Sequence, residues 1–375
     1  MQDCLESDEL VLNRLKQILS IPIYVLMLLM ASSLQAAVVD DLYTVELAVA
    51  DQTTSQRLEV FKLAFHKVIV KVSGSTKVLE HPGMTRPLKS SSRYVHQFRY
   101  ITRKDETEDS FDGGQLFLRV TFNQDVIESL LRSNDIPVWG KERPSTLLLV
   151  SYQLNKNTSV VSGDTTPAIV EELDALAQQQ GLPVLFPLLD LEDRIQFGVQ
   201  DIIESNEENL VMASARYSPD AVLVGQVSGR AGKGWQGIWQ LSFSGQLYNW
   251  TFKTSSRQEL MSQAIAQLAQ TLASEYALAS VASLDEDVLF TVEQVSELTG
   301  HIKVQSYLQS LDAVESVRLV LISQGSVTYR LKLRNSTEDL SRLIELSYVL
   351  EQLDLPQINA ATDDQTILMH YRFIR

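Results

Sequence analysis

The residues best suited to acid–base chemistry are three carboxylates in one short segment of the chain. They lie just after a predicted strand at residues 184–189 and are Asp190, Glu192 and Asp193. Open α/β sheets place their active sites at the ends of strands, and neighbouring carboxylates can act as general acid and base or bind calcium. Acidic residues are also common in solvated loops, which is our interpretation of a second acidic cluster at residues 285–287. The first cluster therefore fits either the site of a hydrolase or an exposed loop.

Other catalytic and metal-binding signatures are absent from the sequence. No histidine lies within five residues of another, and the single cysteine, Cys4, lies near the start of the chain. The glycine-rich loop at residues 229–234 is similar to a phosphate-binding loop, but Gly234 stands where that loop needs Ser or Thr. The loop also joins two predicted strands, whereas a phosphate-binding loop leads into a helix. We therefore expect no catalytic residue, no cofactor, no metal ion and no enzyme activity.

An aromatic hairpin is the strongest candidate for a ligand surface. If the Ser-Gly pair at residues 244–245 forms a two-residue turn, Trp239 pairs with Trp250, and Tyr248 lies on the same face. Such a face can stack a glycan or a peptide, or it can pack beneath the helix predicted at residues 257–276. The opposite face carries Gln, Ser, Asn and Thr side chains, which favours the packing interpretation because that face is the one suited to water.

The sequence predicts three folded modules, and the first covers residues 37–140. Alternating apolar residues indicate strands near 43–49, 94–100 and 116–122, and apolar residues spaced by three and four indicate a helix over 58–72. A second short helix follows the third strand. The order βαββα predicts a ferredoxin-like α+β domain that lacks its last strand.

Two further modules follow. Residues 141–282 begin with an apolar run at 147–150, as in a strand buried on both faces, and the order βαβαββα predicts a three-layer α/β domain. An acidic linker at residues 284–287 leads into the last module, residues 283–375, whose order βαββαβ is again ferredoxin-like. Edge strands of the two ferredoxin-like modules are the docking surfaces that we expect, because a free edge can accept a strand from a partner.

The start of the chain has the residue order of a secretory signal peptide. Arg14 and Lys16 precede the apolar residues 18–30, and small residues up to Ala36 follow. An apolar run of 13 residues is shorter than the about 20 needed to span a bilayer. We therefore expect residues 1–36 to be a signal peptide that is cleaved after Ala36, with an uncleaved anchor as the alternative.

The charge of the chain excludes some partners. The formal net charge is −15, so the surface repels nucleic-acid backbones and anionic lipid headgroups. We expect no nucleic-acid binding and no stable membrane insertion after the signal segment is removed.

A resemblance adds to these expectations. The segment Ile136–Gly140, which contains Pro137, Trp139 and Gly140, is followed by Arg143 and Pro144. It resembles the domain-of-unknown-function family numbered 2066 of Gram-negative proteobacteria, as does the Val-Lys-Val-Ser-Gly segment at residues 70–74. The resemblance extends over nearly the whole chain beyond the signal segment and implies a periplasmic protein, without any assigned activity or catalytic residue.

The central module is also similar, in element order and in the Ala-Val-Leu-Val-Gly segment at residues 221–225, to two periplasmic α/β domains. These are the amino-terminal domain of the Tol system's propeller protein and the curli secretion-channel lipoprotein, which mediate protein contacts at the envelope. We therefore expect a non-catalytic interaction or accessory protein of the cell envelope, located in the periplasm, that binds one or more envelope proteins. The alternatives are a glycan- or lipid-binding module that uses the aromatic hairpin, and an envelope hydrolase with dispersed carboxylates.

Overall fold

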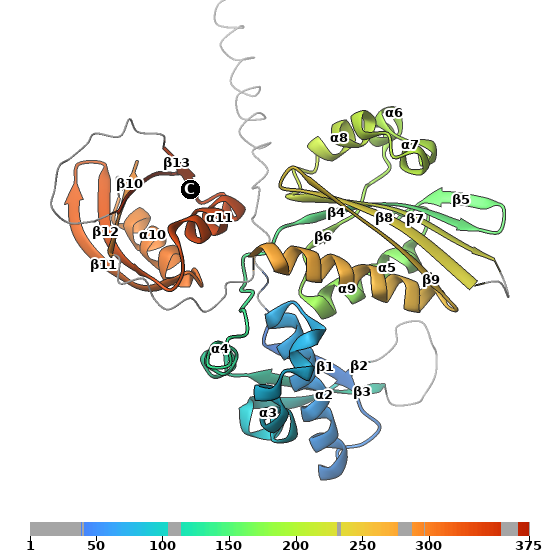
Figure 1. Cartoon of the computed structure of the whole chain (residues 1–375), viewed down its shortest axis with the longest axis horizontal. Coiled ribbons are helices and arrows are strands. Elements are labelled where there is room, and N and C mark those ends of the chain that lie inside the picture. Colours follow the sequence, from blue (N-terminus) through green and yellow to red (C-terminus); the bar gives the residue numbers. More distant parts are fainter. Residues whose placement is uncertain are drawn as a thin grey trace, which may run out of the picture. The chain divides into compact units, whose positions relative to one another are not determined.

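The fold is mixed α+β with three separate sheets (Figure 1), as the sequence predicts. The computed structural model describes residues 39, 41–103, 114–230, 234–276, 287–295, 297–353 and 367–374. The predicted signal segment with Ala36, and residues 284–286 of the predicted linker, lie outside the described residues. Within the described ranges, no helix combines the length and the apolar character that a bilayer span requires.

The first sheet has three antiparallel strands in the order β1-β3-β2. The strands are β1 (Thr44–Ala48), β2 (Val95–Arg103) and β3 (Gln115–Phe122), and the helices are α2 (Thr54–Ser73) and α4 (Gln124–Arg132). The third strand lies between the first two, which is the split βαβ arrangement of a ferredoxin-like unit. Between α2 and β2 the chain forms short helical turns that the sequence analysis did not predict: η1 (Thr76–Glu80), η2 (Pro82–Met84), α3 (Thr85–Lys89) and η3 (Ser91–Tyr94).

Local signals set both ends of α2. The Thr53 hydroxyl accepts a hydrogen bond from the Gln56 backbone N–H and so satisfies one of the free donors of the first turn. Gly74 ends the helix with φ of 69°, a left-handed conformation that glycine adopts without strain. Gly74 has a second role, because a Cβ at this position would lie 2.1 Å from the Cβ of Ala273.

The central sheet has the strand order β5-β4-β7-β8-β9, and β6 also pairs with β4. The strands are β4 (Thr146–Leu154), β5 (Asn157–Val160), β6 (Val184–Leu185), β7 (Ala221–Arg230), β8 (Gly234–Phe243) and β9 (Gln246–Thr254). β4 is parallel to β6 and β7, and the remaining neighbours are antiparallel. The predicted strand at residues 184–189 is thus only two residues long, and β5 was not predicted.

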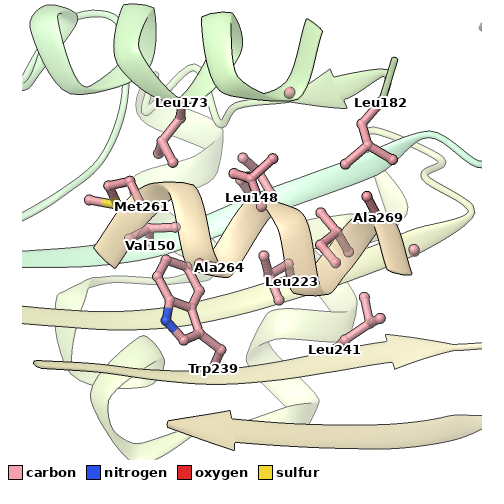
Figure 2. Close-up of a cluster of buried hydrophobic side chains, with 14 of the residues drawn as sticks. Leu148, Val150, Leu173, Leu182, Leu223, Trp239, Leu241, Met261, Ala264 and Ala269 are labelled. Carbon is pink, nitrogen blue, oxygen red and sulfur yellow. The ribbon is translucent and has the colours of Figure 1, made fainter. Parts of the chain in front are cut away.

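Helices cover both faces of this sheet, which gives the predicted three layers (Figure 1). One face packs against α5 (Pro167–Gln180) and α9 (Arg257–Tyr276), and the other packs against α6 (Leu191–Gln196), α7 (Val199–Glu204) and α8 (Glu207–Ala215). Leu148 and Val150 belong to the buried cluster on the face covered by α5 and α9, which Figure 2 shows. Leu147 and Leu149 belong to the buried cluster on the opposite face. All four are fully buried, which explains why the strand is apolar without alternation.

The C-terminal sheet has five strands in the order β11-β12-β10-β14-β13. Its elements are β10 (Asp287–Glu293), α10 (Leu298–Ser310), β11 (Val314–Ser323), β12 (Ser326–Leu333), α11 (Thr337–Ser347), β13 (Leu350–Gln352) and β14 (Ile367–Phe373). Here the predicted order βαββαβ needs correction to βαββαββ. β14 runs parallel to β10, whereas neighbouring strands of a ferredoxin-like sheet are antiparallel.

The lengths of the last two strands explain this difference. β13 has three residues, of which only Leu350 is buried, while β14 has seven residues and buries Met369 and Tyr371. The ring of Tyr371 stacks on Phe290 of β10 with centroids 4.7 Å apart. β14 therefore pairs with β10, because it buries more apolar surface there than the short β13 would.

Candidate functional site

The carboxylates that the hydrolase alternative would use are held in an ion-pair cluster at the start of α6. Asp190 caps this helix and binds Arg216 through both carboxylate oxygens at 2.7 Å. Asp193 is fully buried, accepts a hydrogen bond from the Tyr217 hydroxyl at 2.6 Å and lies 3.1 Å from Arg216. Hydrogen bonds from the Arg216 guanidinium lower the pKa of Asp190, so this carboxyl stays ionised. The exposed Glu192 lies 3.7 Å from Arg216. These ion pairs hold α6 against the turn that follows α8.

The predicted aromatic hairpin lies against α9. Trp239 pairs with Trp250 in the predicted register, and Tyr248 lies on the same face. Trp239 is 1% exposed, and Trp250 and Tyr248 are half-buried against the same apolar cluster. Figure 2 shows Trp239 in this cluster beneath α9. The burial supports the packing interpretation and leaves no open aromatic platform on this face.

Two glycines make room for Trp239, a role that no local pattern of residues indicates. A Cβ at Gly225 would lie 2.4 Å from the indole ring of Trp239, and a Cβ at Gly237 would lie 2.5 Å from its ring nitrogen. Gly225 lies on β7, next to the hairpin, and Gly237 lies on β8, within the hairpin. They allow the large ring to lie flat on the sheet.

The segment behind the family resemblance has a structural role. Arg143 is 2% exposed, and its guanidinium carbon lies 4.0 Å from the ring centre of Trp139, which is fully buried. Its five hydrogen bonds, at 2.8–3.2 Å, go to backbone carbonyl oxygens: those of Lys71, Trp139, Gly140, Gln180 and Gly181. Lys71 and Gln180 lie at the C-terminal ends of α2 and α5, where carbonyl groups lack helical partners and carry partial negative charge.

The other residues of this segment also belong to the connection between the first and central sheets. Pro144 is buried and Pro137 is half-buried. Gly140 is in close contact with Asp312, because a Cβ there would overlap an oxygen of that carboxylate. Pro137, Trp139, Gly140, Arg143 and Pro144 therefore join parts of the fold, and nothing in their geometry indicates a ligand.

The strongest candidate for a functional surface is the free edge of β11. Four consecutive apolar residues, Leu319 to Ile322, are exposed by 46, 50, 56 and 60%. In the described part of the chain β11 pairs only with β12, so its other edge has no strand beside it. The backbone N–H and C=O groups along that edge are available to a partner strand.

The register of β11 exposes apolar side chains on both faces of the sheet. Leu319 lies opposite Tyr329 and Ile322 opposite Val327, and these two partners are buried in the core. The register shifts between Leu319 and Leu321, and Leu321 then lies opposite Thr328. The bulge therefore turns one leucine to the outer face while its neighbours stay on the core side.

The outer face beside this run is basic. Arg318 is exposed and lies directly opposite Arg330 on β12. Lys332 lies further along the same strand and forms an ion pair with Glu315 at 3.4 Å.

Part of this surface was predictable. The order βαββαβ predicted a sheet in the last module, and we expected docking at an edge strand of this module. The exposure of residues 319–322 could not be read from the sequence, because an apolar strand with this pattern is usually covered. It became visible only when the strand order placed β11 at the edge.

Comparisons with known proteins identify one uncharacterised domain. The family model described as a domain of unknown function (DUF8605) matches residues 36–140, which contain the first sheet with α2 and α4. No curated protein matches the chain. A solved structure described as the crystal structure of an uncharacterized protein is 15% identical over 36% of this chain and 92% of its own, with a TM-score of 0.18. The first module is thus similar to a domain of unknown function.

Proposed function

We propose that the protein is an exported, non-catalytic interaction protein of the cell envelope that binds an envelope protein by strand addition to β11. The observation that carries this proposal is the run of four exposed apolar residues, 319–322, on an open sheet edge. The occupant that we propose is an extended segment of a different protein. It would add a strand antiparallel or parallel to β11 and extend the five-stranded sheet.

Strand addition suits both the backbone and the side chains of this edge. The partner's main chain would pair with the free N–H and C=O groups, and its alternate side chains would contact Leu321 on one face and Leu319 and Ile322 on the other. An acidic residue in the partner would be attracted by the exposed Arg318.

The edge of the central sheet provides a contrast within the same molecule. β9 is also an edge strand, but its outer side chains are mostly polar and include the exposed Asn249, Thr251 and Lys253. Polar and charged residues are the usual protection of an edge against unwanted pairing. β11 lacks this protection over residues 319–322, as a binding edge would.

The envelope location is supported by the sequence. Residues 14–36 have the basic, apolar and small-residue order of a signal peptide, and the Pro137–Pro144 segment resembles a periplasmic Gram-negative family. The net charge of −15 opposes binding to nucleic acids or anionic membranes. The hydrolase alternative is less favoured, since Asp190 and Asp193 are both ion-paired to Arg216.

Site-specific photocrosslinking in cells tests the proposal. A photoreactive amino acid is placed at Val320 in the full chain, and the control is the same residue at Leu368. The two side chains are similarly exposed, by 50 and 55%, but Leu368 lies on β14, an interior strand of the sheet, where it pairs with Leu289 of β10. We expect a discrete adduct with one envelope protein from position 320 and none from position 368.

A second variant separates strand addition from chance proximity. Leu321→Lys places a charge in the proposed contact and should reduce the adduct from position 320 by about tenfold, equivalent to ~1.4 kcal/mol. Leu368→Lys should leave the yield unchanged. Equal adducts from both positions, or an adduct that forms only between two copies of this chain, would contradict the proposal, and sedimentation velocity of the purified protein would identify the second case.

A further inference from the structure

The three short helices on one face of the central sheet expose aliphatic side chains where surface helices usually carry polar ones. These helices are α6, α7 and α8, which form one layer on the side of the sheet away from α9 (Figure 1). The most exposed aliphatic residues are Leu191 and Ile195 on α6, at 76% each, and Val211 and Met212 on α8, at 65 and 49%. One exposed aliphatic residue is ordinary on a protein surface, but several in one layer indicate a contact surface.

The outer side of α8 is largely apolar. Glu208, Val211 and Met212 are exposed, and their spacing places them on one side of the helix. Leu210 and Ala213 are on the other side and belong to the buried cluster between the helices and the sheet. A helix that covers a sheet normally turns its apolar side inwards and a polar side outwards. α8 is apolar on both sides, so the core of the central module does not use its outer aliphatic residues.

Polar contacts, and not aliphatic ones, hold α6 in place. Of its six residues only Asp193 is buried. The Asp193 carboxylate accepts a hydrogen bond from the Tyr217 hydroxyl at 2.6 Å and forms an ion pair with Arg216 at 3.1 Å. Leu191 and Ile195 are four residues apart, so they lie on the same side of the helix. The fold therefore fixes the position of α6 and leaves both aliphatic side chains in water.

Acidic side chains lie beside the exposed aliphatic residues. Glu192 precedes Ile195 by three positions, and Glu208 precedes Val211 by three, a spacing that makes neighbours on a helix surface. Both glutamates are exposed. Between residues 188 and 217 the chain carries seven acidic and two basic residues, and one of the basic residues, Arg216, is already ion-paired. The outer surface of the layer thus combines apolar contact area with negative charge.

We infer that the layer of α6, α7 and α8 binds a basic amphipathic helix of another protein. α6 and α8 are neighbours in the layer, so one helix can contact both. The apolar side of the partner helix would cover Ile195, Val211 and Met212, the mode in which an amphipathic helix lies on an apolar surface. Lysine or arginine residues along the borders of that side would pair with Glu192 and Glu208.

The charge of the layer also decides between this partner and other occupants. Acidic side chains repel the headgroups of an anionic membrane. They also repel a second copy of the same acidic surface. A basic helix is the partner for which both the apolar residues and the charges are favourable. This surface belongs to the central module and the β11 edge to the C-terminal sheet, so the two contacts can be tested separately.

Binding of designed peptides to the full chain tests this inference. The probe is a peptide of two repeats of Leu-Lys-Lys-Leu-Leu-Lys-Leu, in which the leucines lie on one side of a helix. One control peptide has the same composition in an order without helical periodicity, and the other has glutamate in place of each lysine. Fluorescence anisotropy should give a Kd of about 1–50 µM for the probe, and binding at least about tenfold weaker for both control peptides.

Substitutions in the protein locate the contact. Ile195→Ser and Met212→Ser should each weaken binding of the probe by about five- to tenfold, because each removes an aliphatic contact. Glu208→Gln should weaken it by about threefold, and by less at high salt, because the lost attraction is electrostatic. Leu298→Ser is the matched control, since Leu298 on α10 is 73% exposed but lies outside the layer. Its variant should bind as the wild type does.

The outcomes separate the possible occupants. Far-ultraviolet circular dichroism and the melting temperature show that each variant is folded. The inference is wrong if the reordered peptide binds as tightly as the probe, or if Ile195→Ser and Leu298→Ser give the same Kd. It is also wrong if Ile195→Ser instead abolishes self-association in sedimentation velocity, or binding to phosphatidylcholine vesicles. The layer would then contact a second copy of this chain or a lipid surface.

Discussion

Arg143 is a buried charge that forms no hydrogen bond to a carboxylate among the described residues. All its hydrogen bonds go to backbone oxygens, which satisfy the five N–H groups of a guanidinium. Burying this charge is tolerable because helix C-terminal carbonyls surround it. The sequence drew attention to Arg143 only through a resemblance. Its role depends on Lys71 and Gln180, which are distant in the chain, and no local pattern could have predicted those contacts.

The neighbouring Glu142 is the residue with the clearest expected pH dependence. Its side chain is 7% exposed, and burial, followed by the charge of Asp312, raises the pKa of its carboxyl from 4.5 to about 7. Lys141 and Arg143 oppose this effect only in part. A raised pKa means that the folded state binds the proton more tightly. The stabilisation is therefore complete below pH 4.5 and is lost as the pH rises through 7.

Glu142→Gln should remove this dependence, because the amide resembles the protonated acid in shape and charge. The variant should match the wild type near pH 4.5 and exceed its free energy of unfolding by about 1–3 kcal/mol at pH 8. Urea unfolding across this range measures the difference. Glu171→Gln, a change at an exposed position, is the control and should give no trend; a difference for Glu142→Gln that does not vary with pH would contradict the assignment.

At the scale of elements, the predictions succeed where local chemistry decides. The Thr53 and Gly74 caps set the ends of α2, and the turn at residues 244–245 sets the register of β8 and β9. They fail where distant segments compete for one place. In the C-terminal sheet, β14 takes the position beside β10 that the shorter strand β13 would otherwise fill.

The hairpin of β8 and β9 allows a test of its packing role. Trp250 is half-buried against the cluster beneath α9, so Trp250→Ala should cost about 2 kcal/mol and lower the melting temperature by about 4–8 °C. Trp250→Phe should recover most of this loss, because the indole nitrogen has no hydrogen-bond partner among the described residues. Thr251→Ala, at the exposed neighbouring position, is the control. An unchanged melting temperature for Trp250→Ala would favour a surface role instead.

At the scale of the whole molecule, periodicity predicts which residues form cores better than it predicts which surfaces remain open. The buried clusters of the three sheets consist largely of residues that the apolar spacing had marked, such as Phe65, Leu223 and Leu331. The β11 edge was not located in this way. It depends on which strands become neighbours, and that outcome is decided by competition across the chain.

Export of the chain is the prediction on which the envelope part of the proposed function depends. Cleavage after Ala36 would remove Cys4, the only cysteine, and leave a protein whose stability does not respond to oxidants or reductants. We expect the product in osmotic-shock fluid to begin at Ala37 by amino-terminal sequencing, and its melting temperature to be the same with and without dithiothreitol. Replacing Leu28 and Leu29 by arginine should block export, because the apolar run would no longer enter the membrane. An intact product of 42.1 kDa found only in the cytosol would contradict export, and the partner of β11 would then have to be a cytosolic protein.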